Sequence, residues 1–263
     1  MRASGPSPEV TDPGPSEGDR FLYHPLGRLK AIAEDLWWVD GPEIGMGVGP
    51  LSVPFPTRMV VARLASGDLW LWSPTPPTPA LLAELAPLGR VAHLISPNRL
   101  HYAFIGQWRP HAPGAVAWAS PGVRERARSQ GISVVFDANL GDRSDAAWAA
   151  TFDQVLYRSS GFLEEVVFFH RASRTLLIAD LIQAMEPERM GWLLRVVTRL
   201  GGNRAPGGTP ADIRWLAKRR RRAARAFYEQ VQRWAPERLI VTHGRNTLEN
   251  AGPVLERALG WMR

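Results

Sequence analysis

The sequence predicts an α/β fold in which helices cover a β-sheet. Strand-like apolar runs and helical patterns follow one another along the chain, and the order hairpin, helix, strand occurs twice. The chain has 263 residues, 45% of them hydrophobic, which suits a domain with a substantial core. Since no linker-like stretch follows residue 20, we predict one domain over residues 21–263. Residues 1–20, rich in Pro, Gly, Ser and acidic residues, are predicted to be a disordered tail.

The first passage opens with a strand over residues 33–40 and a Gly/Pro-rich loop that reaches residue 56. A polar Ser-Gly-Asp turn joins strands over residues 58–64 and 69–72 into a hairpin. Leu and Trp alternate over 69–72, so both faces of that strand are apolar and we expect both to be covered. The elements expected next are a helix over 79–88, strands over 91–95 and 115–119, a helix over 123–130 and a strand over 132–136.

The second passage repeats this order. Strands over residues 165–170 and 175–178 form a hairpin, and His170 is expected to point to solvent at its turn. Apolar residues at helical spacing then predict a helix that Gly201 and Gly202 end. The elements expected after it are a long helix over 212–234, a strand over 238–242 and a C-terminal helix over 247–262.

Composition excludes several functional classes. The chain contains no Cys, which rules out a disulfide scaffold, a thiol nucleophile, a zinc finger and an iron–sulfur cluster. No apolar run approaches the roughly 20 residues that span a bilayer, and the first 20 residues lack the apolar core of a signal peptide. We therefore expect no membrane span and a cytoplasmic location. The signatures of serine hydrolases, phosphate loops and dinucleotide-binding folds are also missing from the sequence.

Four segments carry a resemblance to a known fold. They are the hairpin over 56–74, the run Ser-Pro-Asn-Arg-Leu-His-Tyr at 96–102, a strand pair ending at Asp180, and a strand ending at His243. In this order they resemble the metallo-β-lactamase fold over residues 36–263. The resemblance implies an αββα sandwich, with two mixed sheets flanked by helices. It also implies metal-ligand positions in the 96–102 run, at Asp180, which stands where the family has an Asp that bridges two metals, and at His243, the final ligand.

The departures from that pattern bear on function. Where the family carries Thr-His-x-His-x-Asp-His, Pro97 and Arg99 occupy the two leading His positions, His101 the Asp position and Tyr102 the last His position. A further expected His falls near Gly161. The chain therefore resembles an uncharacterised bacterial family of this fold, a domain of unknown function with a degenerate metal site.

His101, Asp180 and His243 remain as the candidate metal centre. Three protein ligands can hold one zinc ion with a position open for water, so we expect at most one divalent metal, zinc first. Asn98 and Tyr102 could add neutral contacts. The alternative interpretation is structural: Asp180 would accept backbone N–H bonds, and both histidines would be hydrogen-bonded near the end of the sheet.

A basic run on the predicted helix over 212–234 is the strongest charge feature of a chain with a formal net charge of +7. Five consecutive cations would occupy all sides of a helix, so some should lie near the body of the protein. They suit a nucleic acid or an anionic membrane, or alternatively form a solvated face in an Arg-rich protein. These cations are Lys218, Arg219, Arg220, Arg221 and Arg222.

Three functional hypotheses follow. The first is a hydrolase-like protein with a degenerate site and weak or absent hydrolysis of an ester, a thioester or a phosphodiester. Its partner would be an unidentified small molecule. The second is a non-catalytic binding or scaffolding protein that kept the fold. The third, which we favour least, is nucleic-acid binding through the Arg-rich helix over 212–234.

Overall fold

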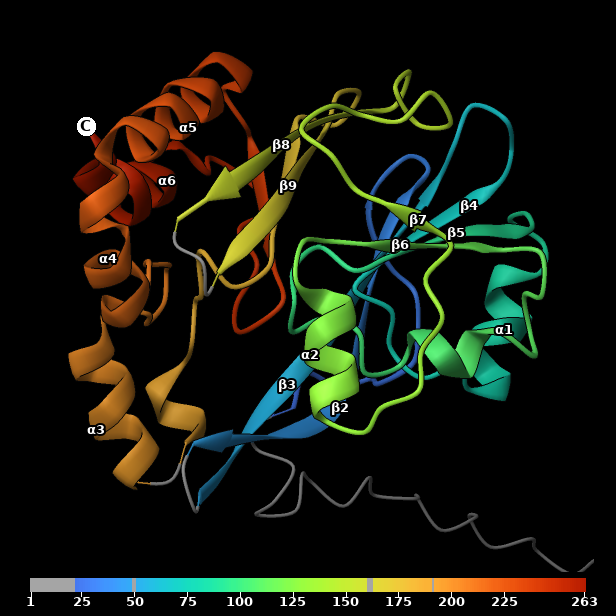
Figure 1. The fold of residues 1–263 in the computed structure, drawn as a ribbon, viewed down its shortest axis with the longest axis horizontal. Helices are drawn as coiled ribbons and strands as arrows, with labels where there is room; N and C mark the ends of the chain where they lie inside the picture. Colours follow the sequence, from blue (N-terminus) through green and yellow to red (C-terminus); the bar gives the residue numbers. More distant parts are fainter. Residues whose placement is uncertain (1–21, 49–50, 160–162, 191) are drawn as a thin grey trace, which may run out of the picture.

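Two β-sheets face each other in the computed structural model, which describes residues 22–48, 51–159, 163–190 and 192–263 (Figure 1). The first sheet has seven strands that lie side by side in chain order. They are β1 (Lys30–Ala33), β2 (Leu36–Val48), β3 (Leu51–Arg63), β4 (Leu69–Trp72), β5 (Val91–Ile95), β6 (Val116–Ala119) and β7 (Ala138–Asn139). Pairing is antiparallel from β1 to β4 and parallel from β4 to β7, so the sheet is mixed.

The second sheet is also mixed and has the order β11-β10-β9-β8. Its strands are β8 (Phe152–Arg158), β9 (Glu164–His170), β10 (Thr175–Ile178) and β11 (Arg238–Val241). The pairs β8·β9 and β9·β10 are antiparallel, whereas β10 and β11 run parallel. Parallel neighbours bring their C-terminal ends to the same edge of a sheet, so the residues after β10 and after β11 lie close together.

Helices cover the outer face of each sheet (Figure 1). The α-helices are α1 (Pro79–Leu85), α2 (Val123–Ser129), α3 (Trp192–Gly201), α4 (Ala211–Ala217), α5 (Arg221–Trp234) and α6 (Gly252–Leu259). Short 3₁₀ turns are η2 (Ile105–Trp108), η3 (Pro187–Arg189), η4 (Lys218–Arg220) and η5 (Gly260–Met262). Side chains of α1, α2 and η2 cover the first sheet, and those of α5 and α6 cover the second. The structure thus confirms the αββα sandwich.

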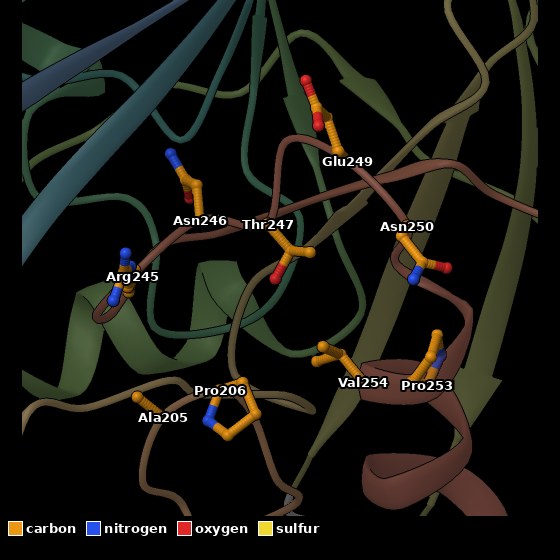
Figure 2. Close-up of a pocket in the computed structure, with 9 residues that line it drawn as sticks. All are labelled: Ala205, Pro206, Arg245, Asn246, Thr247, Glu249, Asn250, Pro253 and Val254. Carbon is orange, nitrogen blue, oxygen red and sulfur yellow. The ribbon is translucent and has the colours of Figure 1, made fainter.

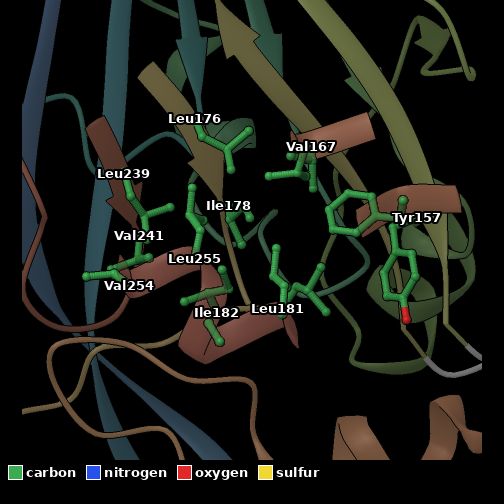
Figure 3. Close-up of a cluster of buried hydrophobic side chains, with 14 of the residues drawn as sticks. Tyr157, Val167, Leu176, Ile178, Leu181, Ile182, Leu239, Val241, Val254 and Leu255 are labelled. Carbon is green, nitrogen blue, oxygen red and sulfur yellow. The ribbon is translucent and has the colours of Figure 1, made fainter. Parts of the chain in front are cut away.

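Strands with two apolar faces join these layers. In β9, Val166 and Phe168 belong to the cluster between the sheets, whereas Val167 and Phe169 belong to the cluster under the helices. Figure 3 shows the second cluster, where strand residues such as Leu176 and Val241 meet Leu255 of α6. All four residues of β4 are buried, as their alternation predicts. Burial on both faces gives each central strand roughly twice the apolar area that a solvent-facing strand would bury.

The long hairpin of β2 and β3 corrects the predicted loop over residues 41–56. The two strands pair from Leu36 to Val48 with one irregularity, and the pairs include Glu43 with Pro56 and Gly45 with Pro54. Proline is compatible with a strand edge whose N–H groups face no partner. β4 pairs with Val60–Arg63, so among the described residues the part of β3 before Val60 has no strand partner on that edge.

Three further predictions of strands and helices are wrong: one strand, the continuity of one helix and the start of another. Residues 132–136 form no strand; β7 occupies the sheet edge instead, and Val135 is exposed. The expected helix over 212–234 is α4, η4 and α5, with the 3₁₀ turn inside the basic run. All five cations of the run are exposed, whereas some were expected to lie near the body of the protein. The C-terminal helix begins at Gly252 rather than 247, with Pro253 in its first turn, where proline is favoured. β1 and β8 were not predicted.

Predictions of a tail, of a domain division and of no membrane span concern the chain as a whole. The tail predicted over residues 1–20 lies outside the described residues. The division into a tail and one domain stays a prediction. None of the helices in the described part of the chain has the length and apolarity that a bilayer crossing requires.

His170 corrects another expectation, because its side chain is buried rather than directed to solvent. Its ring lies edge-on to Phe152, with ring centres 5.1 Å apart, and Nδ1 accepts a hydrogen bond from the backbone N–H of Ser173. Burial lowers the pKa of His170 from 6.5 to about 4, against a smaller opposing effect of Asp35. The folded protein therefore holds His170 neutral at pH 7.

We predict that this histidine makes stability depend on pH. The unfolded chain takes up the proton near pH 6.5 and the folded chain only near pH 4, so the free energy of unfolding falls as the pH drops through that window. The loss attributable to His170 between pH 7.5 and 5 is about 2 kcal/mol. Urea unfolding of the wild type and His170→Gln at both pH values measures it. Equal pH dependence of the two proteins would contradict the prediction.

Candidate metal centre

His101, Asp180 and His243 converge beyond the C-terminal ends of three strands. His101 lies in the segment after β5, Asp180 is the second residue after β10, and His243 is the second after β11. One ligand atom from each lies within 4.8 Å of the other two. His101 Nε2 is 3.1 Å from Asp180 Oδ2, and His243 Nε2 is 3.2 Å from Asp180 Oδ1. The carboxylate therefore stands between the two imidazoles, one oxygen toward each.

The charge state of Asp180 follows from these neighbours. Burial alone would raise the pKa of Asp180, but His101 and His243 together hold it well below the usual range. Asn98 also donates a hydrogen bond from Nδ2 to Asp180 Oδ2 at 2.8 Å. Asp180 is thus an anion at neutral pH and is available as a hard oxygen ligand.

The surroundings of His243 test whether the site fits a cation. Nδ1 lies 2.8 Å from the carbonyl oxygen of Pro56, which can only accept, so Nδ1 carries a proton. Nε2 is buried and forms no hydrogen bond with any described residue. Nε2 lies 3.2 Å from Asp180 Oδ1, and a positive charge between the two groups, either a proton or a metal ion, satisfies both. The backbone bond to Nδ1 is the usual support of a metal-binding imidazole, so the residues fit a divalent ion.

His101 is the more accessible of the two imidazoles. Its side chain is 11% exposed, against 2% for His243 and 6% for Asp180. Its Nδ1 lies 2.8 Å from the hydroxyl of Ser73, the residue directly after β4. The ring centres of His101 and His243 are 5.5 Å apart. Entry to the site is therefore on the His101 side.

The carboxylate of Glu165 holds two of the three ligand segments in place. Its Oε1 accepts the N–H of Ala179, and its Oε2 accepts the N–H groups of Asp180 and Leu181. Oε2 also accepts Asn98 Nδ2 at 3.2 Å, which connects it to the segment that carries His101. Burial, followed by the charge of Asp180, raises the pKa of Glu165 to about 7, against the opposing hydrogen bonds.

Arg58 holds the third ligand segment. Its guanidinium donates from Nη1 to the carbonyls of Val241 and Gly244, both at 2.7 Å, on either side of His243. Asp40 fixes the other side of the guanidinium, with Oδ1 at 2.6 Å from Nη2. Since Arg58 lies on β3 and Val241 on β11, this contact joins the two sheets beside the site.

The turn after His243 requires glycine. Gly244 has a φ of +103°, and a Cβ there would lie 2.0 Å from the carbonyl oxygen of Ala184. The same carbonyl accepts the N–H of Arg245, and the N–H of Ala184 donates to the carbonyl of His243. Only a residue without a side chain permits this close approach.

The remaining positions of the 96–102 run have other tasks. The carbonyl of Pro97 accepts the N–H of Val166 in β9. The ring of Tyr102 packs in the cluster under α1 and α2, and burial raises its pKa against opposing effects of Arg126 and Arg99. The side-chain amide of Asn98 donates hydrogen bonds to the carboxylates of Glu165 and Asp180, so it supports a candidate ligand. The ligand expected near Gly161 lies outside the described residues.

Glu165 and Arg58 were not predicted from the sequence as site residues. Glu165 is the buried acid in the apolar run Glu-Val-Val-Phe-Phe, and an acid in such a run is a signal that could have found it. Arg58 opens the apolar strand over 58–64 in the same way. Long charged side chains are almost never fully buried without a partner, so each marks a structured polar contact.

A cavity lies beside the chain segment that follows His243. It has a volume of about 600 Å³ and lies between residues 205–206 and the segment from Arg245 to Val254 (Figure 2). Asn246 in its wall accepts hydrogen bonds from Arg58 and from the N–H of Val241. None of the three candidate ligands lines this cavity.

A family model decides which family the chain belongs to. The model of a domain of unknown function, DUF4336, matches residues 35–193, more than half of the chain. The chain belongs to the DUF4336 family. The match includes His101 and Asp180, whereas His243 lies C-terminal to it. No curated protein matches this DUF4336 protein by sequence.

Several solved metallo-β-lactamases have a fold similar to that of this chain. DIM-1 exposed to ceftazidime has a TM-score of 0.60 and 13% identity, with 89% of this chain and 95% of that one covered. FIM-1 from Pseudomonas aeruginosa, in a mono-zinc form, has a TM-score of 0.58 and 12% identity, with 89% and 94% covered. The enzyme from Erythrobacter litoralis has a TM-score of 0.59 and 13% identity, with 89% and 95% covered. At these identities the likeness shows the metallo-β-lactamase fold.

We predict that Glu165→Ala severely destabilises this DUF4336 protein. The change leaves buried N–H groups of Ala179, Asp180 and Leu181 without their acceptor, which costs roughly 3 kcal/mol or more. Glu164→Ala is the matched control, because Glu164 is the neighbouring, partly exposed acid on β9. Urea unfolding compares both variants with the wild type. A Glu165→Ala protein as stable as the control would contradict the assignment.

Proposed function

We propose that the protein binds one divalent metal ion, zinc first, through His101, Asp180 and His243. The observation that carries the proposal is the buried Nε2 of His243, which faces Asp180 Oδ1 at 3.2 Å and has no hydrogen-bond partner of good geometry among the described residues. An ion between these groups would satisfy both. Three ligands of the types His, Asp and His suit zinc and leave one of four positions open. The mono-zinc form of FIM-1 supports a single ion in this fold.

We further propose that the metal-bound protein slowly hydrolyses an ester, a thioester or a phosphodiester. The ion would supply Lewis acidity toward a carbonyl or phosphoryl oxygen. The chain's part is to hold Asp180 ionised, to orient the His243 ring through the Pro56 carbonyl, and to present the His101 side of the site to solvent.

A binding role without catalysis is the second candidate function, and burial favours it. The side chains of His243 and Asp180 are 2% and 6% exposed and that of His101 is 11% exposed, so little of the triad is open to a bulky substrate. A buried site of this kind suits a metal that stabilises the fold. The proposed function therefore has two separable parts, the presence of the ion and the turnover of a substrate.

We predict one equivalent of zinc, iron or manganese in the purified wild-type protein. An Asp180→Ala, His243→Ala double variant should contain none, since both buried ligands are lost. His111→Ala is the control, because His111 is an exposed histidine outside the triad. Elemental mass spectrometry measures the metal content, before and after reconstitution. Absence of metal from the reconstituted wild type would overturn the proposal.

Turnover has its own test. We predict that the zinc-loaded wild type hydrolyses at least one of a nitrophenyl ester, an acyl thioester and a bis-nitrophenyl phosphate above the rate without protein. His101→Ala should lower that rate at least about tenfold, because it removes the accessible ligand. His111→Ala should retain it. A wild type that binds zinc but hydrolyses none of the three would leave the binding role as the function.

A further inference from the structure

Large apolar side chains are exposed on α3 and α4. Trp192 is 77% exposed, Leu200 81%, Val196 47% and Trp215 66%. Residues four apart lie on one face of an α-helix, so Trp192, Val196 and Leu200 form a stripe along α3. Surface residues of this kind normally occur singly, and a stripe of them marks an interaction site.

The same region is strongly basic. Arg199 lies one residue from Leu200 in α3, and Arg214 precedes Trp215 in α4. The basic run 218–222 follows directly and is exposed throughout. None of these seven cations forms a salt bridge with a described residue, whereas Arg225 further along pairs with Glu229. Asp212 is the exposed acid of α4.

The helices that carry these apolar and basic residues lie along one edge of the molecule. In Figure 1, α3, α4 and the start of α5 follow one another along the edge that is farthest from α1. We call these exposed residues the α3–α4 surface. Its apolar members are Trp192, Val196, Leu200 and Trp215, and its basic members are Arg199, Arg214 and residues 218–222. It contains no residue of the metal triad, so what it binds is independent of the proposed metal function.

The composition of the α3–α4 surface selects its partner. Contact with the same surface of a second copy would bring two clusters of cations together, which repel. A nucleic acid would pair with the cations and stack on tryptophan, but it would leave Val196 and Leu200 without an apolar partner. An anionic bilayer offers phosphates to the arginines, the headgroup boundary to the tryptophans and acyl chains to the aliphatic side chains.

We propose that the α3–α4 surface docks the protein on an anionic lipid bilayer. In this orientation α3 lies in the plane of the interface with its exposed stripe inserted among the headgroups, while the basic run contacts lipid phosphates. Each cation near such a surface strengthens binding about fivefold, so several together give an affinity that depends on salt. No crossing of the bilayer is involved.

Vesicle co-sedimentation of the full chain tests the proposal. Vesicles of phosphatidylcholine with 30% phosphatidylglycerol should bind the wild type at low salt, and pure phosphatidylcholine vesicles should bind it at least about tenfold more weakly. The Trp192→Gln, Leu200→Gln variant should lose at least about tenfold in affinity for the anionic vesicles. Val135→Gln, which changes a residue 66% exposed outside this surface, is the matched control and should bind like the wild type.

A second variant separates the apolar and basic contributions. Replacing Arg220, Arg221 and Arg222 with Gln removes three of the seven cations, so it should weaken vesicle binding and reduce its salt dependence. Since these side chains are exposed, both variants should keep the wild-type circular dichroism spectrum. Vesicle binding unaffected by Trp192→Gln, Leu200→Gln, or binding to a single-stranded oligonucleotide with none to vesicles, would overturn the proposal.

Discussion

The buried carboxylate of Glu165 is the contact on which the site depends. A completely buried acid is costly unless donors surround it, and here three backbone N–H groups and the Asn98 amide do so. Because the donors belong to the segments after β5 and after β10, the carboxylate fixes the two segments relative to each other. His101 lies in the segment after β5 and Asp180 in the segment after β10, so contacts within the protein position both candidate ligands.

Arg58 extends this arrangement to the third ligand. It joins β3 to the segment around His243, while Gly244 permits the approach to Ala184 that holds the turn closed. Three loops of two different sheets are thus held by buried polar groups that need not contact an ion. Pro97 and Arg99 stand where the related pattern has two histidines, and under the proposed function this support would hold the three remaining ligands in place.

The outline of the fold was predictable wherever periodicity was strong, as in the alternating Leu and Trp of β4 and the apolar run of β9. Prediction failed where tertiary pairing overrides local signals: Pro54 and Pro56 suggested a loop, yet they lie on the open edge of a long hairpin. The candidate ligands came from a resemblance. Glu165 and Arg58 are marked in the sequence only as charged residues in apolar runs, and their partners come from distant segments that one sequence does not reveal. The prediction that His170 points to solvent failed for the same reason, because Phe152 on another strand packs against its ring.

A crystal structure of the zinc-reconstituted protein, with anomalous diffraction at the zinc edge, tests the central claim most directly. We predict one anomalous peak, about 2.0–2.2 Å from His101 Nε2, His243 Nε2 and an oxygen of Asp180. Two peaks at this position would contradict the single-metal account. A triad without a peak, with its histidines hydrogen-bonded to Asp180 in zinc-containing crystals, would instead establish the three residues as a structural cluster.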